Sequence, residues 1–308
     1  MRKFLFVSLL LAACVAAASR PPLARLAPTT GATGQDIPQV LKTDCSTKVK
    51  LAPKPLVVSF PSPPSLPGPN QKTLYGYVFK PATGAASYPA VVWNHGSGLD
   101  PTAEKVFELA SFYTTHGYVF FTPHRTGHGL SKAAGPSAAT EMDNCQGPDA
   151  RTCKVHLHEK ANLDVVAAVT WLKQQPYVKH DQIYMSGLSY GGIQTLLSAE
   201  KGLGLRGFVA FSPAAQSWAN DKLRDRLKTA AVNAQPPIFL LQAEGDYSTG
   251  PYDVIGTYLN SKGGLNKGKL YPKYGTTPQK AHHGFAMECQ GVEIWDEDVL
   301  AFLNAALN

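Results

Sequence analysis

The chain has 308 residues, of which 44% are hydrophobic and 17% charged, a composition typical of a globular protein with one large or two small domains. Its formal net charge at pH 7 is +7, but its lysines and arginines are scattered and form only short basic runs. Scattered basic residues argue against the concentrated positive surface of nucleic-acid-binding proteins. We therefore expect no nucleic-acid partner.

The N-terminus has the features of a secretory signal peptide. Residues 1–3 are basic at positions 2 and 3, residues 4–13 are apolar but too few to span a bilayer, and small residues follow. We expect residues 1–18 to be the signal peptide, with Ala-Ala-Ala at 16–18 as the cleavage site. Alternatively, Leu-Ala-Ala-Cys resembles the lipobox of bacterial lipoproteins, in which Cys14 would be lipidated. Both interpretations predict export to the bacterial periplasm, cell envelope or medium, with membrane contact only through the possible lipid anchor.

Cysteine usage agrees with export. Of the five cysteines, Cys14 lies in the signal region, and the other four are an even set that an oxidising compartment would most simply join as two disulfides. Cys145 and Cys153 would close a small loop, which leaves Cys45 to pair with Cys289. Four free buried thiols are the alternative. The close cysteine spacing of zinc sites is absent, and we expect no metal.

Residues 19–70 are rich in proline and are expected to form a tether and an irregular segment laid over the main domain. From residue 71 to 308, short apolar runs alternate with helical patterns. The expected strands are 56–60 (an edge strand flanked by prolines), 73–79, 90–94, 118–122, 183–185, 207–211, 237–242 and 269–274. The expected helices are 104–115, 157–174, 190–201, 221–231, 252–259 and 294–306. This alternation predicts an α/β domain with a mostly parallel sheet of about eight strands and helices on both faces.

In the long helix expected at 157–174, one set of side chains recurs at helical spacing. These are Leu163, Val166, Ala167, Thr170 and Trp171. Their spacing places them on one face of the helix.

The stretch Gly-Leu-Ser-Tyr-Gly-Gly at 187–192 joins the strand 183–185 to the next helix, with Ser189 at the apex of the turn. Glycines beside a strained turn avoid steric clashes. The new helix directs free N–H groups and a partial positive charge at the serine. Such a site suits a nucleophile and the oxyanion that it generates. A glycine-rich turn that only packs the backbone or binds a phosphate is the alternative.

A serine nucleophile needs a base, and in sheets of this type the chain order is serine, acid, histidine. Only His282 and His283 follow Ser189. We take His283 as the base, because Gly284 after it allows the loop to turn closely over the sheet edge. His282 is the alternative base, and a purely structural role for both histidines is the other alternative.

The acid should lie in the loop after the apolar strand 237–242. Asp246 follows a glycine in that loop and is our candidate. Glu244 is the alternative, because its longer side chain could reach the histidine from a slightly different position.

An acyl-transfer site also needs two donors for the oxyanion. We expect the Tyr190 backbone N–H, at the first turn of the nucleophile helix, to be one of them. The other should be the Ser97 or Gly98 amide, in the glycine-bearing loop after the strand 90–94. Gly96 and Gly98 are then expected to tolerate no added bulk.

Other polar residues give weaker signals. His95 is expected to form structural hydrogen bonds rather than to act as a second base. His156, His158 and Glu159 resemble a metal cluster, but histidines at i and i+2 of a helix point to different faces. The glycine-rich loop at 124–129 could bind an anion or stabilise a turn near the mouth of the site.

Together these motifs resemble the α/β-hydrolase superfamily, most closely its dienelactone hydrolase-like branch and more weakly the prolyl oligopeptidase-type peptidases. The resemblance covers roughly residues 73–308 and is carried by the segments 94–98, 123–129, 187–192, 244–246 and 283–285. It implies an α/β-hydrolase fold with Ser189 as nucleophile, Asp246 as acid and His283 as base. The founding dienelactone hydrolases carry cysteine at the nucleophile position, so their lactone specificity is not implied.

We therefore expect a serine hydrolase that cleaves a small-molecule carboxylic ester without a cofactor. His283 would remove the Ser189 proton, an acyl-enzyme would form, and water would release the acid. Since the unperturbed pKa of histidine is about 6.5, activity should fall as the pH drops through that region. A prolyl oligopeptidase-like serine peptidase and a non-catalytic binding protein on the same fold are the alternatives, and no pattern in the sequence sets an oligomeric state.

Overall fold

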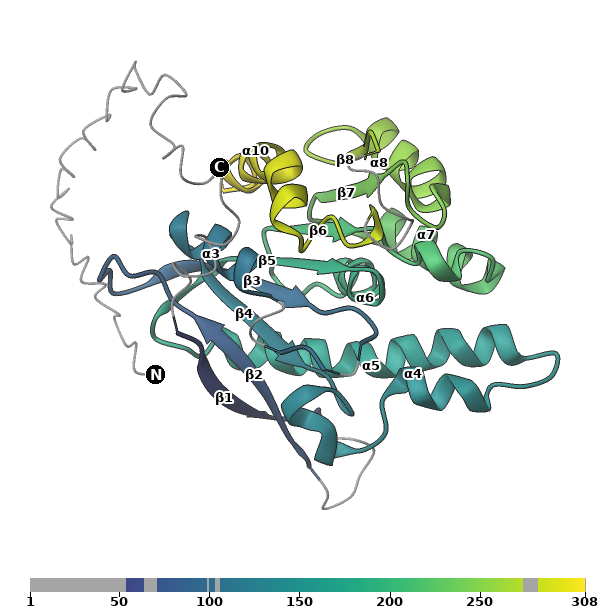
Figure 1. The fold of residues 1–308 in the computed structure, drawn as a ribbon, viewed down its shortest axis with the longest axis horizontal. Coiled ribbons are helices and arrows are strands. Elements are labelled where there is room, and N and C mark those ends of the chain that lie inside the picture. Colours follow the sequence, from purple (N-terminus) through teal and green to yellow (C-terminus); the bar gives the residue numbers. More distant parts are fainter. Residues whose placement is uncertain (1–53, 64–70, 99, 103–105, 274–281, 308) are drawn as a thin grey trace, which may run out of the picture. The chain divides into compact units, whose positions relative to one another are not determined.

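Runs of β-branched and aromatic residues form one eight-stranded sheet in the computed structural model (Figure 1). The structure describes residues 54–63, 71–98, 100–102, 106–273 and 282–307. The strands are β1 (Leu56–Pro61), β2 (Thr73–Phe79), β3 (Tyr88–Asn94), β4 (Val119–His124), β5 (Val178–Leu188), β6 (Gly207–Phe211), β7 (Ile238–Ala243) and β8 (Lys267–Tyr271). Across the sheet their order is β1-β2-β4-β3-β5-β6-β7-β8. The β1–β2 and β2–β4 pairs are antiparallel and the other pairs are parallel, so the predicted mostly parallel sheet is confirmed.

Helices cover both faces of this sheet. They are α3 (Phe107–Thr115), α4 (Ala138–Glu141), α5 (Ala150–Leu172), α6 (Tyr190–Ala199), α7 (Asp221–Asn233), α8 (Thr257–Lys262) and α10 (Cys289–Ala305). Short helical turns lie at η2 (Gly129–Ala134), η3 (Met142–Asn144), η4 (Ala215–Ser217) and η5 (Tyr252–Gly256). One face packs against α5, α6 and α7, and the other packs against α3 and α10. Within the described ranges, no helix is both long and apolar enough to cross a bilayer.

The register of the parallel strands brings their carboxyl ends to one edge. Asn94 at the end of β3 lies opposite Gly187 of β5, and Leu188 lies opposite Phe211 of β6. Phe211 in turn lies opposite Leu241 of β7. Ligands of parallel α/β sheets bind at this edge, so the loops after β3, β5, β6 and β7 are placed to form a site.

Helix α5 begins earlier than predicted, and its predicted face borders a surface cavity. It begins at Ala150, seven residues before the expected start at 157, because its first turns are polar and partly exposed and so lack an apolar stripe. The expected face of five residues does share one side of the helix, but that side borders a surface cavity described below. The neighbouring stripe of Val165, Ala168, Val169 and Leu172 is buried in the core, and Trp171 of the predicted face packs against the same core.

Cys145 and Cys153 form a disulfide, the pair that their spacing predicts. It joins the turn after η3 to the first turn of α5, with the two Cα atoms 5.8 Å apart. Cys289 is also disulfide-bonded. Its expected partner Cys45 lies outside the described residues, as do the expected signal peptide with Cys14 and most of the proline-rich segment.

Candidate active site

The turn between β5 and α6 holds Ser189 in a strained conformation. Its backbone has φ 60° and ψ −115°, a region that residues with a side chain rarely adopt. The Ser189 N–H donates to the Phe211 carbonyl at 2.9 Å, and its carbonyl accepts from the Ile193 N–H at 3.0 Å. These two hydrogen bonds hold the turn on both sides. A strained backbone conformation persists only where the surrounding structure holds it in this way.

Close backbone packing explains the glycines of this turn. A Cβ atom on Gly191 would lie 1.8 Å from the Asn94 carbonyl oxygen, and one on Gly187 would lie 2.5 Å from the Gly191 oxygen. The turn therefore packs directly on the end of β3. The expectation for Gly96 and Gly98 is wrong for a methyl group. A Cβ on Gly96 has its nearest contact at 3.9 Å, and one on Gly98 meets no atom of the described residues within 4 Å.

The expected acid and base lie together. His283 Nδ1 is 2.7 Å from Asp246 Oδ1, with the Asp246 side chain fully buried and the His283 side chain 13% exposed. The alternative residues are placed differently. Glu244 is exposed to solvent, and the buried His282 packs its ring against Gly245, where a Cβ would lie 2.1 Å from His282 Nδ1.

Two further donors bind the Asp246 carboxylate. The Tyr247 N–H donates to Oδ1 at 2.7 Å, and Gln242 Nε2 donates to Oδ2 at 3.0 Å. The Gln242 Oε1 accepts from the Tyr252 N–H at 3.0 Å, which fixes the orientation of the amide. Sequence reasoning missed Gln242. Its signal was a polar residue in the otherwise apolar run 237–242.

A cavity of about 400 Å³ lies beside Ser189. Its lining includes the expected oxyanion residues Ser97 and Tyr190, whereas Gly98 is exposed and outside the lining. The remaining lining residues are Ala139, Met142, His158, Ile193, Ala214, Gln216 and Ser217. The structure thus brings the loop after β3 and the first turn of α6 to the same cavity as the serine.

The ionisable side chains that line this cavity are uncharged at neutral pH. Burial, with a smaller contribution from the positive charge of Arg125, lowers the pKa of His158 to about 3. Burial raises the pKa of Tyr190 to about 12, although Arg125 acts against it. The cavity wall therefore presents dipoles and apolar surface rather than charge.

The three residues that resemble a metal cluster in the sequence, His156, His158 and Glu159, do not converge on one site in the structure. His156 is exposed, whereas the His158 ring lies 4.6 Å from the Tyr190 ring. Glu159 forms an ion pair with Arg226 at 2.8 Å. Among the residues that the structure describes, no group of three or more metal-ligating side chains is arranged to hold an ion.

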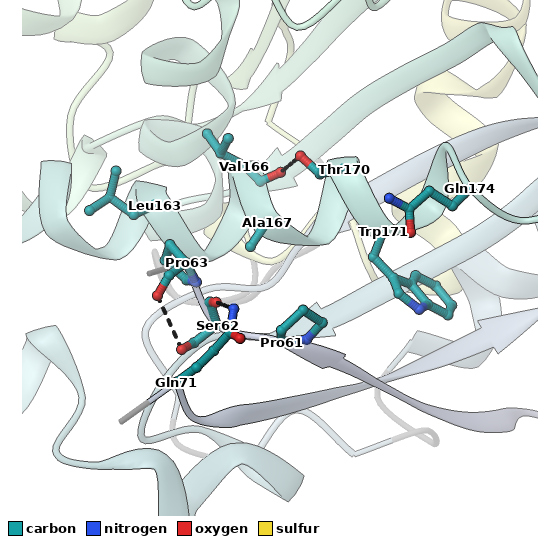
Figure 2. Close-up of a pocket in the computed structure, with 10 residues that line it drawn as sticks. All are labelled: Pro61, Ser62, Pro63, Gln71, Leu163, Val166, Ala167, Thr170, Trp171 and Gln174. Atoms are coloured by element: carbon teal, nitrogen blue, oxygen red, sulfur yellow. Dashed lines mark hydrogen bonds between the residues drawn. The ribbon is translucent and has the colours of Figure 1, made fainter. Parts of the chain in front are cut away.

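A second, more apolar cavity of about 290 Å³ lies between the end of β1 and the outer side of α5 (Figure 2). Figure 2 shows the lining residues, which come from the end of β1, the segment that follows it and α5. None of the candidate catalytic residues lines it. We therefore place the candidate active site at the cavity beside Ser189.

Comparison with known proteins agrees with this fold. Residues 74–292 match the model of the dienelactone hydrolase family. The polyketide transferase grgF of Penicillium sp is 26% identical over 183 residues, which are 57% of this chain and 55% of that protein. The chain thus spans about half the length of this curated relative.

Two solved structures illustrate the likeness. The esterase Pf2001 of Pyrococcus furiosus has a TM-score of 0.58 at 17% identity, over 84% of this chain and 93% of its own. A putative dienelactone hydrolase from Klebsiella pneumoniae has a TM-score of 0.54 at 15% identity, over 81% of this chain and 99% of its own. At such low identity these structures establish the fold alone, which is the α/β-hydrolase fold.

Proposed function

Because the chain belongs to the dienelactone hydrolase family, we propose that it is a hydrolase that cleaves carboxylic esters with Ser189, His283 and Asp246 as its catalytic triad. The observation that carries the proposal is the 2.7 Å contact between His283 Nδ1 and the buried Asp246 carboxylate. A histidine held in this way by a buried acid is the arrangement that activates a serine nucleophile.

The hydrogen bond to Asp246 defines the role of the imidazole. Nδ1–H donates to the carboxylate, which leaves Nε2 free to act as a base. Ser189 follows β5 and Asp246 follows β7, two strands across the sheet at about 4.8 Å per strand. Nε2 would take the Ser189 Oγ proton as the oxygen attacks the ester carbonyl.

The backbone amides of Tyr190 and Ser97 would bind the resulting oxyanion. Tyr190 begins α6, so its N–H is one of the free donors at the positive end of the helix dipole. Ser97 borders the same cavity from the loop after β3. Collapse of the tetrahedral intermediate would expel the alcohol, protonated by His283, and leave the acyl-enzyme. Water activated by the same histidine would then release the acid.

The cavity favours an uncharged ester. Its volume of about 400 Å³ falls in the range of small-molecule sites, and its ionisable lining residues His158 and Tyr190 are neutral. A charged acyl group would lose its hydration without gaining a counter-charge from the lining. Together with serine at the nucleophile position, this supports simple esters over carboxylate-bearing lactones.

The test compares the wild type with Ser189→Ala on neutral p-nitrophenyl esters of increasing acyl length and on aminoacyl anilides. Ester turnover that disappears in Ser189→Ala is the expected result. Faster cleavage of the anilides would identify a peptidase instead. A fluorophosphonate probe that labels neither protein would mean that the fold serves binding and not catalysis.

A further inference from the structure

A buried arginine lies directly behind the candidate oxyanion hole. Arg125 follows β4 and is 2% exposed. Its Nη2 donates to the His95 carbonyl at 2.9 Å and to the Gly96 carbonyl at 2.8 Å. Both carbonyls belong to the loop that carries Ser97. Because an isolated buried cation is strongly destabilising, a guanidinium in this place calls for a specific role.

The guanidinium also contacts the first residue of α6, the helix that follows Ser189. Arg125 Cζ lies 4.8 Å from the centroid of the Tyr190 ring, within the range of a cation–π contact. Tyr190 is the residue whose N–H is the other candidate donor. Arg125 therefore contacts the backbone of the loop that carries Ser97 and the side chain of Tyr190, the residues that supply the two candidate donors.

His95 completes the arrangement. Its Nδ1 lies 2.8 Å from the Gly96 carbonyl, so Nδ1–H can donate to that oxygen. Burial lowers the pKa of His95 well below its usual value, and Arg125 adds to this effect, so the ring is neutral beside the guanidinium. The two hydrogens of Arg125 Nη2 are thereby left for the two carbonyls.

The rest of the guanidinium faces a small cavity. Nε and Nη1 of Arg125 have no hydrogen-bond partner among the described residues, and the residue borders a cavity of about 70 Å³ together with Thr126, His128 and Asp164. That volume is enough for about two water molecules. Arg125 therefore holds the loop that carries Ser97 through Nη2, and it contacts α6 through the Tyr190 ring.

We propose that Arg125 is a positioning residue that holds the Ser97 amide and the Tyr190 amide at the spacing that binds the oxyanion. This proposal rests on the proposed esterase function. Lysine could supply the charge but not the planar group that lies on the Tyr190 ring while one nitrogen reaches two carbonyls. Since Arg125 does not line the cavity beside Ser189, its effect should be on the transition state and not on substrate binding.

The experiment measures kcat and KM for a neutral p-nitrophenyl ester in Arg125→Lys and Arg125→Met. Misplacing one donor lowers kcat by about 10²-fold or more, with little change in KM. A phenylboronic acid, which forms a tetrahedral adduct with an active serine, should lose a similar factor in affinity. Arg125→Lys should lie between Arg125→Met and the wild type.

Arg226→Met is the matched control. This arginine pairs with Glu159 and Glu200 on α5 and beside α6, so its loss should reduce stability and leave kcat unchanged. If Arg125→Met fails to fold, as judged by circular dichroism, Arg125→Lys carries the comparison. Folded Arg125 variants with wild-type kcat, or with reduced kcat but unchanged boronate affinity, would overturn the positioning role. Ester turnover that survives in Ser189→Ala would instead overturn the proposed function.

Discussion

The Gln242 amide donates to Oδ2 of Asp246 at 3.0 Å, while His283 binds the other oxygen, Oδ1, of the same carboxylate. The Asp246 side chain has no exposed surface, so water cannot easily replace a lost partner. A hydrogen bond to a buried charge contributes about 1.5–3 kcal/mol. Gln242 thus holds the Asp246 carboxylate in the orientation that binds His283.

We predict that Gln242→Leu lowers kcat by about tenfold or more, because the carboxylate loses a donor on its buried side and orients His283 less well. Steady-state kinetics on a neutral ester would measure this loss. Gln235→Leu makes the same change at an exposed position and should leave kcat unchanged. Equal kinetics in the two variants would show that Gln242 does not support the acid.

The strain at Ser189 gives a second prediction. Its φ of 60° is costly for any residue with a Cβ atom but not for glycine. We therefore expect both Ser189→Gly and Ser189→Ala to be inactive. Ser189→Gly should be the more stable of the two, by about 1 kcal/mol, because strain of this kind costs about 1–3 kcal/mol and glycine loses more backbone entropy on folding. Urea unfolding of both variants tests this, and a less stable Ser189→Gly would show that the turn stores little strain.

Gly191 and Gly96 give a matched pair for the packing of the turn. A Cβ at Gly191 would lie 1.8 Å from a backbone oxygen that cannot move aside, whereas one at Gly96 has its nearest contact at 3.9 Å. We predict that Gly191→Ala costs several kcal/mol of stability, on the order of 3 kcal/mol, or prevents folding. Gly96→Ala should unfold near the wild-type urea concentration. A well-folded, active Gly191→Ala would mean that β3 and α6 pack less closely than described.

The same pair shows what the sequence could and could not predict. The motif at 187–192 predicted a strand, a sharp turn and a helix, because local backbone requirements select glycine there. Which glycines tolerate a methyl group depends on what lies across the fold, and so the expectation for Gly96 and Gly98 was wrong. Asp246 and His283 were predicted by chain order. Gln242 and Arg125 act through contacts with Asp246 and with the loop after β3. The sequence marks Gln242 as a polar residue in an apolar run, but it does not show which residues either side chain contacts.

The last prediction concerns stability in acid. Four buried histidines, His95, His124, His128 and His158, lie near Arg125. Burial, followed by the charge of Arg125, lowers the pKa of His124 to about 4 and that of His158 to about 3. The same two causes lower the pKa of His128 to about 4, and that of His95 is lowered well below its usual range.

In the unfolded chain these side chains take up protons near pH 6.5, whereas in the folded protein they stay neutral down to about pH 4. The unfolded state therefore binds more protons between these values, and stability is lost as the pH falls through this window. Each histidine that stays neutral contributes about 1.4 kcal/mol per pH unit. Burial raises the pKa of the nearby Asp164, which opposes part of this loss at its acid end.

We predict that the urea midpoint is constant above about pH 7 and falls steadily between about pH 6.5 and 4.5. His128→Gln should reduce the slope of this fall, because one neutral buried imidazole is removed. His156→Gln changes an exposed histidine and should keep the wild-type slope. A midpoint independent of pH across this window would mean that the four imidazoles are hydrated or charged in the folded protein. That result would also contradict the conclusion that the lining of the cavity beside Ser189 is uncharged, because this conclusion depends on a neutral His158.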